Sequence, residues 1–124
     1  MNSKEFKQFR SRLQKTQKQM AVLLGTSTKA IHSYEQGWRS IPPHVERQVL
    51  FLVSRLNYSD KKPRKCWAIL KCPKKRKEQC PAWEFKLGEL CWFINGTICQ
   101  GQPQSTWQAK METCKLCEVF TAQL

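Results

Sequence analysis

The chain contains 124 residues, of which 22 are lysine or arginine and 9 are aspartate or glutamate, so its formal net charge is +13. This length allows one ordinary domain or two small ones, and a 40% apolar content excludes a disordered chain. The positive charge indicates an anionic partner such as nucleic acid or an acidic membrane surface. No apolar run approaches the roughly 18 residues of a membrane span, and the first residues lack the apolar stretch of a secretion signal. We therefore expect a cytoplasmic protein without membrane contacts, in which thiols stay reduced.

The cysteines divide the chain, because all seven lie between Cys66 and Cys117. Residues 1–58 carry helical periodicity, and 59–65 form a polar, basic stretch typical of a linker. Residues 66–124 are rich in tryptophan, cysteine, proline and glycine and poor in helix signals. The predicted fold class is a helical domain followed by a small cysteine-rich, irregular or β domain. The second unit is too small to bury a large core, so its cysteines are expected to stabilise it.

Apolar spacing and end signals predict four helices in the first unit. They cover 3–13, 17–24, 28–36 and a stretch from Pro42-Pro43 to about Leu56. Thr16 and Ser27 are suitable N-caps for the second and third helices, and Gly25 and Gly37 follow their ends. Two short helices joined by a glycine-containing turn describe a helix-turn-helix, although an ordinary small helical bundle would also need such a glycine.

Residues 17–37, Gln-Lys-Gln-Met-Ala-Val-Leu-Leu-Gly-Thr-Ser-Thr-Lys-Ala-Ile-His-Ser-Tyr-Glu-Gln-Gly, closely resemble the Cro/C1-type (XRE-type) helix-turn-helix family. The resemblance covers about residues 3–57 and implies a bundle of four to five helices whose third helix enters the major groove of double-stranded DNA. It also implies a structural ion pair between Arg10 and Glu35. Because one module makes few base contacts, the family normally binds as a homodimer on two half-sites.

The same resemblance assigns DNA contacts to residues around the third helix. Thr28, Lys29, His32 and Ser33 should face outward and meet base edges. Gln17 should touch the DNA backbone or an adjacent base. Arg39 and Ser40 are placed as phosphate contacts, which give affinity and salt dependence without sequence choice. The expected DNA-binding residues are therefore Gln17, Thr28, Lys29, His32, Ser33, Arg39 and Ser40.

An odd number of cysteines in a reduced compartment argues against a disulfide scaffold. Metal or iron–sulfur ligation, redox sensing and simple burial remain as alternatives. Cys114-x-x-Cys117 has the spacing of half a zinc site, which thiol redox pairs share. Asn95-Gly96 predicts a β-hairpin over 91–99, which would place Cys91 and Cys99 on opposite faces. The candidate ligands for zinc or an iron–sulfur cluster are Cys72, Cys80, Cys99, Cys114 and Cys117.

The cysteine-rich half resembles the two-CW domain of bacterial signalling and regulatory proteins over about residues 65–121. The matching residues are Cys66-Trp67, Cys72, Cys80-Pro-Ala82, Cys91-Trp92, Gly96-Thr-Ile-Cys-Gln-Gly101, and Lys110 with Cys114-x-x-Cys117. The spacers on either side of Cys80 are shorter than in many members. The resemblance implies a domain identity and leaves its ligand open.

Residues 61–77 carry nine lysines and arginines and no acid, a run that suits either a solvated face or phosphate tracking beside the helix-turn-helix. We expect a non-enzymatic, sequence-specific transcriptional regulator whose cysteine unit is metal-bound or redox-sensing. The alternatives are a signalling adaptor whose helical unit binds protein, and an iron–sulfur or thiol redox protein.

Overall fold

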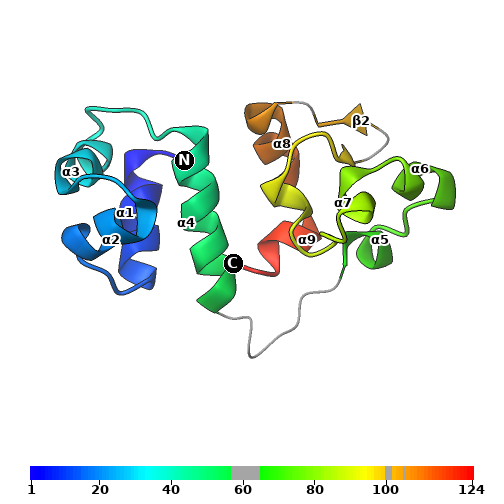
Figure 1. The fold of residues 1–124 in the computed structure, drawn as a ribbon, viewed down its shortest axis with the longest axis horizontal. Coiled ribbons are helices and arrows are strands. Elements are labelled where there is room, and N and C mark those ends of the chain that lie inside the picture. Colours follow the sequence, from blue (N-terminus) through cyan, green and yellow to red (C-terminus); the bar gives the residue numbers. More distant parts are fainter. Residues whose placement is uncertain (57–64, 100–101, 105) are drawn as a thin grey trace. The chain divides into compact units, whose positions relative to one another are not determined.

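The computed structural model describes residues 1–56, 65–99, 102–104 and 106–124. It divides the chain into two compact units, Met1–Leu56 (unit 1) and Asn57–Leu124 (unit 2), and most of the described residues are helical (Figure 1). Of the expected linker 59–65, only Lys65 belongs to the described residues. In the part of the chain that the structure covers, no helix is both long and apolar enough to cross a membrane.

Unit 1 consists of four helices, which confirms the four predicted ones. They are α1 (Ser3–Arg12), α2 (Gln17–Leu24), α3 (Thr28–Gln36) and α4 (Pro43–Leu56). Helix α1 packs against α3 and α4, and α2 packs against α3 and α4. In Figure 1, α1 lies between α3 and α4, so α3 has one side directed away from the bundle.

The ends of α2 and α3 are fixed by local interactions of the predicted residues. The Thr16 hydroxyl accepts a hydrogen bond from the Gln19 amide at 3.1 Å, and the Ser27 hydroxyl accepts one from the Ala30 amide at 3.1 Å. Gly25 and Gly37 end the helices with φ of +65° and +76°, a left-handed conformation that costs a residue with a Cβ about 1 kcal/mol or more. These signals set the length and direction of the α2–turn–α3 segment.

The core of unit 1 is apolar and comes from all four helices. Phe6, Met20, Ile31 and Val49 are fully buried, and Phe6 meets Tyr34 edge-to-face with ring centroids 5.7 Å apart. This packing holds α3 against the bundle by one face and leaves its other face to solvent.

Unit 2 is built from short elements. They are α5 (Cys66–Ile69), α6 (Lys74–Glu78), α7 (Pro81–Glu84), the 3-10 turn η1 (Cys91–Phe93), β1 (Ile98–Cys99), β2 (Gln102–Pro103), α8 (Trp107–Cys114) and α9 (Glu118–Thr121). Strands β1 and β2 pair antiparallel, with Ile98 opposite Pro103 and Cys99 opposite Gln102. Of the helices in the described part of this unit, only α8 reaches two turns, so local helix signals contribute little here.

The hairpin predicted over 91–99 is wrong. Residues 91–93 form the turn η1 instead of a strand, because the Trp92 side chain is fully buried and packs edge-to-face on Phe120 at 5.4 Å. Gly96 keeps the expected positive φ of +83°. The strand pair starts after it, at β1, and its connection at 100–101 lies outside the described residues.

Gly88 holds α5 against the loop before η1. Its carbonyl accepts the Cys66 amide at 2.8 Å, and a Cβ added at Gly88 would lie 2.7 Å from the Lys65 Cβ and 2.9 Å from the Trp67 ring. This close approach is possible only without a side chain.

We expect Gly88→Ala to lower the free energy of unfolding of unit 2 by about 1–3 kcal/mol, the usual cost of overpacking. Urea unfolding followed by tryptophan fluorescence measures it. In the control Gly96→Ala, the added Cβ meets only the Pro81 Cγ at 3.7 Å, so its loss should be limited to backbone strain of about 1 kcal/mol. An equal or smaller loss in Gly88→Ala would contradict the packing described.

Candidate functional site

Helix α3 presents a polar face that unit 1 leaves uncovered. Thr28, Lys29 and His32 are exposed, whereas Ala30, Ile31 and Tyr34 are buried against the bundle. The His32 ring also meets the exposed Trp38 ring edge-to-face at 5.4 Å. Hydroxyl, ammonium and imidazole groups thus stand together on the first turns of one helix, where they are free to meet hydrogen-bonding groups of a partner.

Ser33 does not share this face, so the expectation that it points outward is wrong. It is 8% exposed, and its hydroxyl donates to the Lys29 carbonyl at 2.9 Å. Serine commonly forms such a bond back to the preceding turn inside a helix. Ser33 therefore belongs to the packed side of α3.

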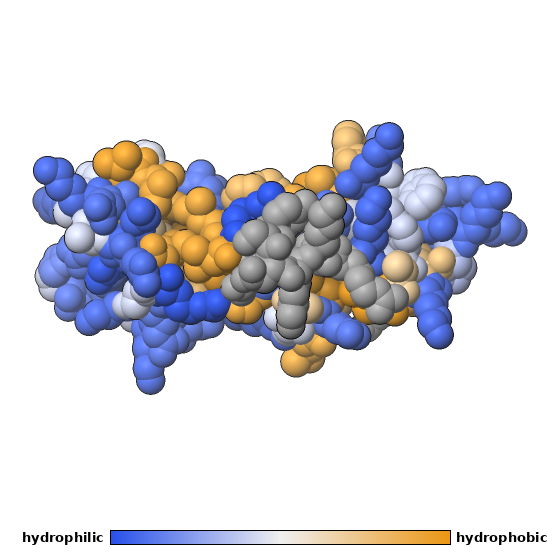
Figure 2. All heavy atoms as spheres, turned by 90° about the horizontal axis from the view of Figure 1, so that it is seen from below, coloured by the Kyte–Doolittle hydropathy of each residue, from blue (hydrophilic) through white to orange (hydrophobic). Residues whose placement is uncertain are grey.

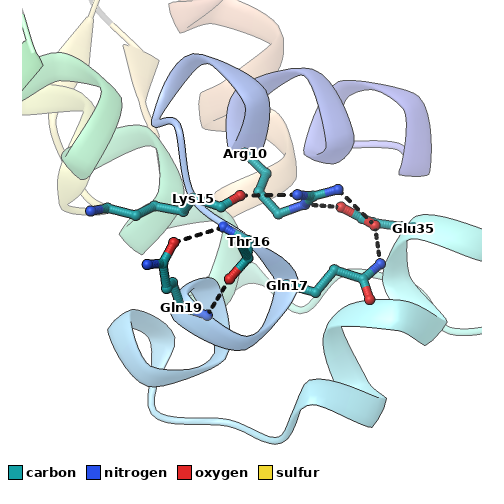
Figure 3. Close-up of polar contacts among 6 residues, drawn as sticks. All are labelled: Arg10, Lys15, Thr16, Gln17, Gln19 and Glu35. Atoms are coloured by element: carbon teal, nitrogen blue, oxygen red, sulfur yellow. Dashed lines mark hydrogen bonds and ion pairs between the residues drawn. The ribbon is translucent and has the colours of Figure 1, made fainter.

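Gln17 is half-buried and takes part in a network that joins the first three helices. Its amide group donates to Glu35, which also forms the expected ion pair with Arg10 (Figure 3). Arg10 Nη1 further donates to the Lys15 carbonyl at 2.9 Å. The prediction of the Arg10–Glu35 pair is confirmed, and Gln17 acts at least in part as an internal brace for the start of α2.

Arg39 and Ser40 are exposed in the loop that connects α3 to α4. The Arg39 guanidinium lies 5.6 Å from the centre of the Tyr34 ring. This contact directs a positive charge to the end of α3 without burying it.

Glu35 is nearly buried, with a side chain 3% exposed. Burial alone would raise its pKa, but hydrogen bonds from Arg10 and Gln17 and the charge of Arg10 together hold the pKa below its usual value. A carboxylate with a lowered pKa stabilises the folded state above the unfolded value of 4.5. Its contribution is lost as the pH falls through the folded pKa.

We expect Glu35→Gln to lose about 1–3 kcal/mol of unfolding free energy at pH 7, and to lose little more on acidification below about pH 5. Urea titrations of the full chain at several pH values, read from the amide NMR signals of α1–α3, measure both effects. Glu5→Gln is the control, because glutamine keeps the capping hydrogen bond that Glu5 forms at α1. If the free energy of unfolding fell by the same amount on acidification in Glu35→Gln and in the unchanged protein, the role assigned to Glu35 would be contradicted.

Five cysteines of unit 2 line one cavity of about 150 Å³, here called the cysteine cavity. They come from five separate segments between α5 and β1: Cys66, Cys72, Cys80, Cys91 and Cys99. Trp67 and Trp83 also line it, with their rings edge-to-face at 4.9 Å. A small irregular fold has thus gathered side chains that are far apart in the sequence.

A second cavity, of about 140 Å³, is lined by Cys91, Cys99, Cys114 and Cys117. Cys91 and Cys99 therefore line both cavities. The prediction that Cys91 and Cys99 lie on opposite faces depended on a hairpin over 91–99. Because residues 91–93 form η1 instead, that prediction is wrong as well. Each of the seven cysteines lines one or both cavities. The cysteines are therefore gathered around two spaces and are not buried separately at unrelated places.

Thr97 and the backbone of β1 form hydrogen bonds with two of the sulfurs. The Ile98 amide donates to Cys80 Sγ at 3.4 Å, and Thr97 Oγ1 lies 3.6 Å from Cys99 Sγ. Burial raises the pKa of Cys72 and Cys99 and raises that of Cys114 to about 11. A hydrogen bond between Cys66 and Cys91 lowers the pKa of Cys66 and raises that of Cys91.

The candidate ligands Cys72, Cys80, Cys99, Cys114 and Cys117 are distributed over the two cavities, and Cys99 is common to both. Among the described residues, no three histidine, cysteine, aspartate or glutamate side chains stand close enough to hold one metal ion. The chemistry of the donors suits soft metals, while their present spacing does not suit a single ion.

Lys110 is a functional candidate that the sequence analysis did not single out as a site residue. It is fully buried, and its ammonium group donates to Thr97 Oγ1 at 2.5 Å. Its charge lowers the pKa of four thiols, those of Cys66, Cys91, Cys99 and Cys114, although other effects outweigh it at the last three. The signal was present in the sequence, because Lys110 falls within the buried stripe Trp107, Lys110, Met111 and Cys114 of α8.

The basic run of unit 2 continues on α6, where Lys74 and Lys75 are exposed and Lys77 lies 4.4 Å from the centre of the Trp83 ring. Hydrophilic side chains cover the α6 end of this unit in the face shown in Figure 2. Lys61, Lys62 and Arg64 of the same run lie outside the described residues.

Comparisons of the chain with protein-family models, with curated proteins and with solved structures found no match.

Proposed function

We propose that the protein is a sequence-specific, DNA-binding transcriptional regulator of the cytoplasm, with a Cro/C1-type helix-turn-helix in unit 1. The observation that carries the proposal is the uncovered face of α3, where Thr28, Lys29 and His32 are exposed near the helix N-terminus. Arg39 and Ser40 are exposed just after the same helix. An α-helix fits the major groove, and these groups match the donors and acceptors of base edges and phosphates.

Lys29 is the strongest candidate for base recognition in this proposal, because its ammonium group can donate to guanine O6 and N7. Thr28 offers a methyl group to thymine and a hydroxyl to a base acceptor. His32 adds a third contact, and Arg39 and Ser40 bind phosphate. A homodimer on two half-sites would double these few contacts. Unit 2 serves in this scheme as the metal-bound or redox-sensitive module that alters affinity or dimer geometry.

We expect the double variant Thr28→Ala, Lys29→Ala to lose sequence selectivity, since each good base contact contributes about 1–3 kcal/mol. The measurement is fluorescence anisotropy with a duplex selected from a random pool and with a scrambled duplex. The variant should bind the selected duplex about 10-fold to 1,000-fold more weakly and the scrambled duplex almost unchanged. Arg55→Ala, in the last turn of α4, is the control of matched charge. Tight, selective binding that survives in the double variant would refute the assignment of α3.

We expect the basic surface of α6 to contribute affinity for DNA without sequence selectivity. The reason is that lysines attract phosphates by charge, and the phosphate charge is the same in every sequence. The double variant Lys74→Gln, Lys75→Gln should weaken binding to the selected and scrambled duplexes by the same factor. It should also reduce the slope of log affinity against log salt by about 2 if both lysines meet phosphates. The control is Lys86→Gln, Lys115→Gln, which removes two exposed charges elsewhere in unit 2. Equal effects in both double variants would reject a specific role for α6.

The exposed Val22 and Leu23 on α2, 78% and 47% accessible, favour a second candidate, an adaptor whose helical unit binds another protein. An adaptor would show weak, non-selective DNA binding with steep salt dependence. The selection experiment above distinguishes the two, because only a sequence-reading protein enriches a common sequence from the pool.

A further inference from the structure

Unit 2 buries a lysine, Lys110, beside a threonine, Thr97, and the two residues are 0% and 1% exposed. Among the described residues, no carboxylate lies within 4.0 Å of the Lys110 ammonium, whose hydrogen-bond acceptor is Thr97. Burial of an ammonium is unfavourable unless a negative charge compensates it. Thr97, the hydrogen-bond acceptor of Lys110, lies among the cysteines that line the cysteine cavity, so an anionic group bound there would compensate this charge.

The hydrogen bonds show which sulfur is linked to the Lys110 ammonium. An ammonium group can only donate, so Thr97 Oγ1 accepts from Lys110 and keeps one hydrogen of its own to donate. Cys99 Sγ lies 3.6 Å from that oxygen. The chain thus runs from Lys110 through Thr97 to Cys99, whose sulfur accepts the Thr97 hydrogen when it is a thiolate. Cys80 Sγ accepts from the Ile98 amide at 3.4 Å, so a hydrogen-bond donor stands beside two sulfurs of the cysteine cavity once Cys99 is a thiolate.

The walls of the cysteine cavity suit a negatively charged group that is bound through cysteine sulfurs. Arg76 and Lys77 line it, and no aspartate or glutamate is found among the described residues of its lining. An iron–sulfur cluster is such a group, because four cysteine thiolates on its core leave a net negative charge. Hydrogen bonds to the sulfurs stabilise that charge.

Five thiols line one shared cavity, while no three of the described residues are gathered for a single ion. Four sulfurs around one zinc, with Zn–S bonds near 2.3 Å, must lie about 3.8 Å from one another. No three ligand-type side chains of the described residues are gathered for one ion, yet five thiols surround a space of about 150 Å³. In an iron–sulfur cluster the four thiolates bind more than one iron, so all four need not meet at one point.

We propose that the cysteine cavity binds an iron–sulfur cluster through Cys80, Cys99 and two of Cys66, Cys72 and Cys91, with Lys110 as a positioning residue that acts through Thr97. This inference rests on the sensor role proposed for unit 2 and deepens it by naming the bound group. It makes no use of the contacts of α3. The positive charge of Lys110 and the Thr97 hydrogen bond favour the more negative, reduced cluster, so both raise its reduction potential.

The first test is metal content of the full chain, purified without oxygen and also reconstituted with ferrous iron, sulfide and a thiol reductant. We expect brown protein with iron and acid-labile sulfide bound, and loss of that colour in Cys80→Ser and in Cys99→Ser. Cys114 and Cys117, candidate ligands by their spacing, are left out of this proposed site because they line only the second cavity. The control is therefore Cys117→Ser, which should keep the colour. Colourless protein that holds zinc and rejects iron would overturn the proposal. Loss of the cluster in Cys117→Ser to the same extent as in Cys80→Ser would also overturn it.

The second test separates the role of Lys110 from a merely structural one. In a dithionite titration followed by electron paramagnetic resonance, Lys110→Met should shift the midpoint potential to more negative values. Thr97→Val, of nearly the same shape, should shift it in the same direction. Lys115→Met, an exposed lysine at the end of the same helix, should leave the potential unchanged. If circular dichroism shows that Lys110→Met does not fold, Thr97→Val decides. An unchanged potential in the folded variants would overturn the role of the Lys110–Thr97 chain.

DNA binding measured on the same samples keeps the two proposals apart. Protein that carries the cluster but enriches no sequence would refute the DNA-binding proposal and leave this one standing. Protein that selects a sequence but binds no iron would refute the cluster proposal and leave the DNA-binding proposal standing.

Discussion

Unit 2 depends on how the charge of Lys110 is compensated. The side chain is fully buried, and the burial of an uncompensated ammonium would cost several kcal/mol, a large share of the total stability of a small domain. The nearest polar partner is a neutral hydroxyl, Thr97, which satisfies one hydrogen bond but supplies no charge. The thiols around it can supply that charge once they are deprotonated. Binding of a soft metal centre would therefore stabilise the fold and the buried cation together.

Unit 1 is stabilised in a different way, by an apolar core, capped helices and buried ion pairs. The two buried acids of this unit have partners: Glu35 pairs with Arg10, and Glu46 pairs with the N-terminal amino group at 3.0 Å. The helix ends are capped by nearby side chains, and Gly25 and Gly37 take the conformations that stop α2 and α3. As a result, the exposed face of α3 is already shaped before any partner arrives, which limits the entropy lost on binding.

The sequence predicted unit 1 well and unit 2 poorly, for physical reasons. The helices of unit 1 follow local signals such as the Thr16 and Ser27 caps, and the Arg10–Glu35 pair follows a resemblance that covers this region. Ser33 was misplaced because its burial depends on how α3 rotates against the bundle. In unit 2, the hairpin failed at Cys91–Phe93 because tertiary packing of Trp92 outweighs the strand propensity of the segment.

The cysteine cavity was beyond prediction from spacing for the same reason. Its thiols come from separate short segments, and the fold of loops between them is set by contacts such as that of Gly88 with Trp67. Lys110 would normally be assigned to the surface, since lysine is almost never fully buried unless it is paired. Its position within the apolar stripe of α8 is the one local sign of its burial.

If unit 2 holds a metal centre as proposed, the two units would respond differently to its loss. Unit 1 keeps its capped helices and buried ion pair, because none of these interactions involves a cysteine. Unit 2 would lose the negative charge that balances Lys110 and the bonds that hold its short elements together, so it would loosen first. Such loosening would also change the positions of the α6 lysines. Any contribution that these lysines make to the proposed DNA binding would change with them, because charges interact within about one Debye length, roughly 10 Å. If the protein binds DNA as proposed, a change in the cysteine unit would in this way alter DNA affinity without any rearrangement of α3.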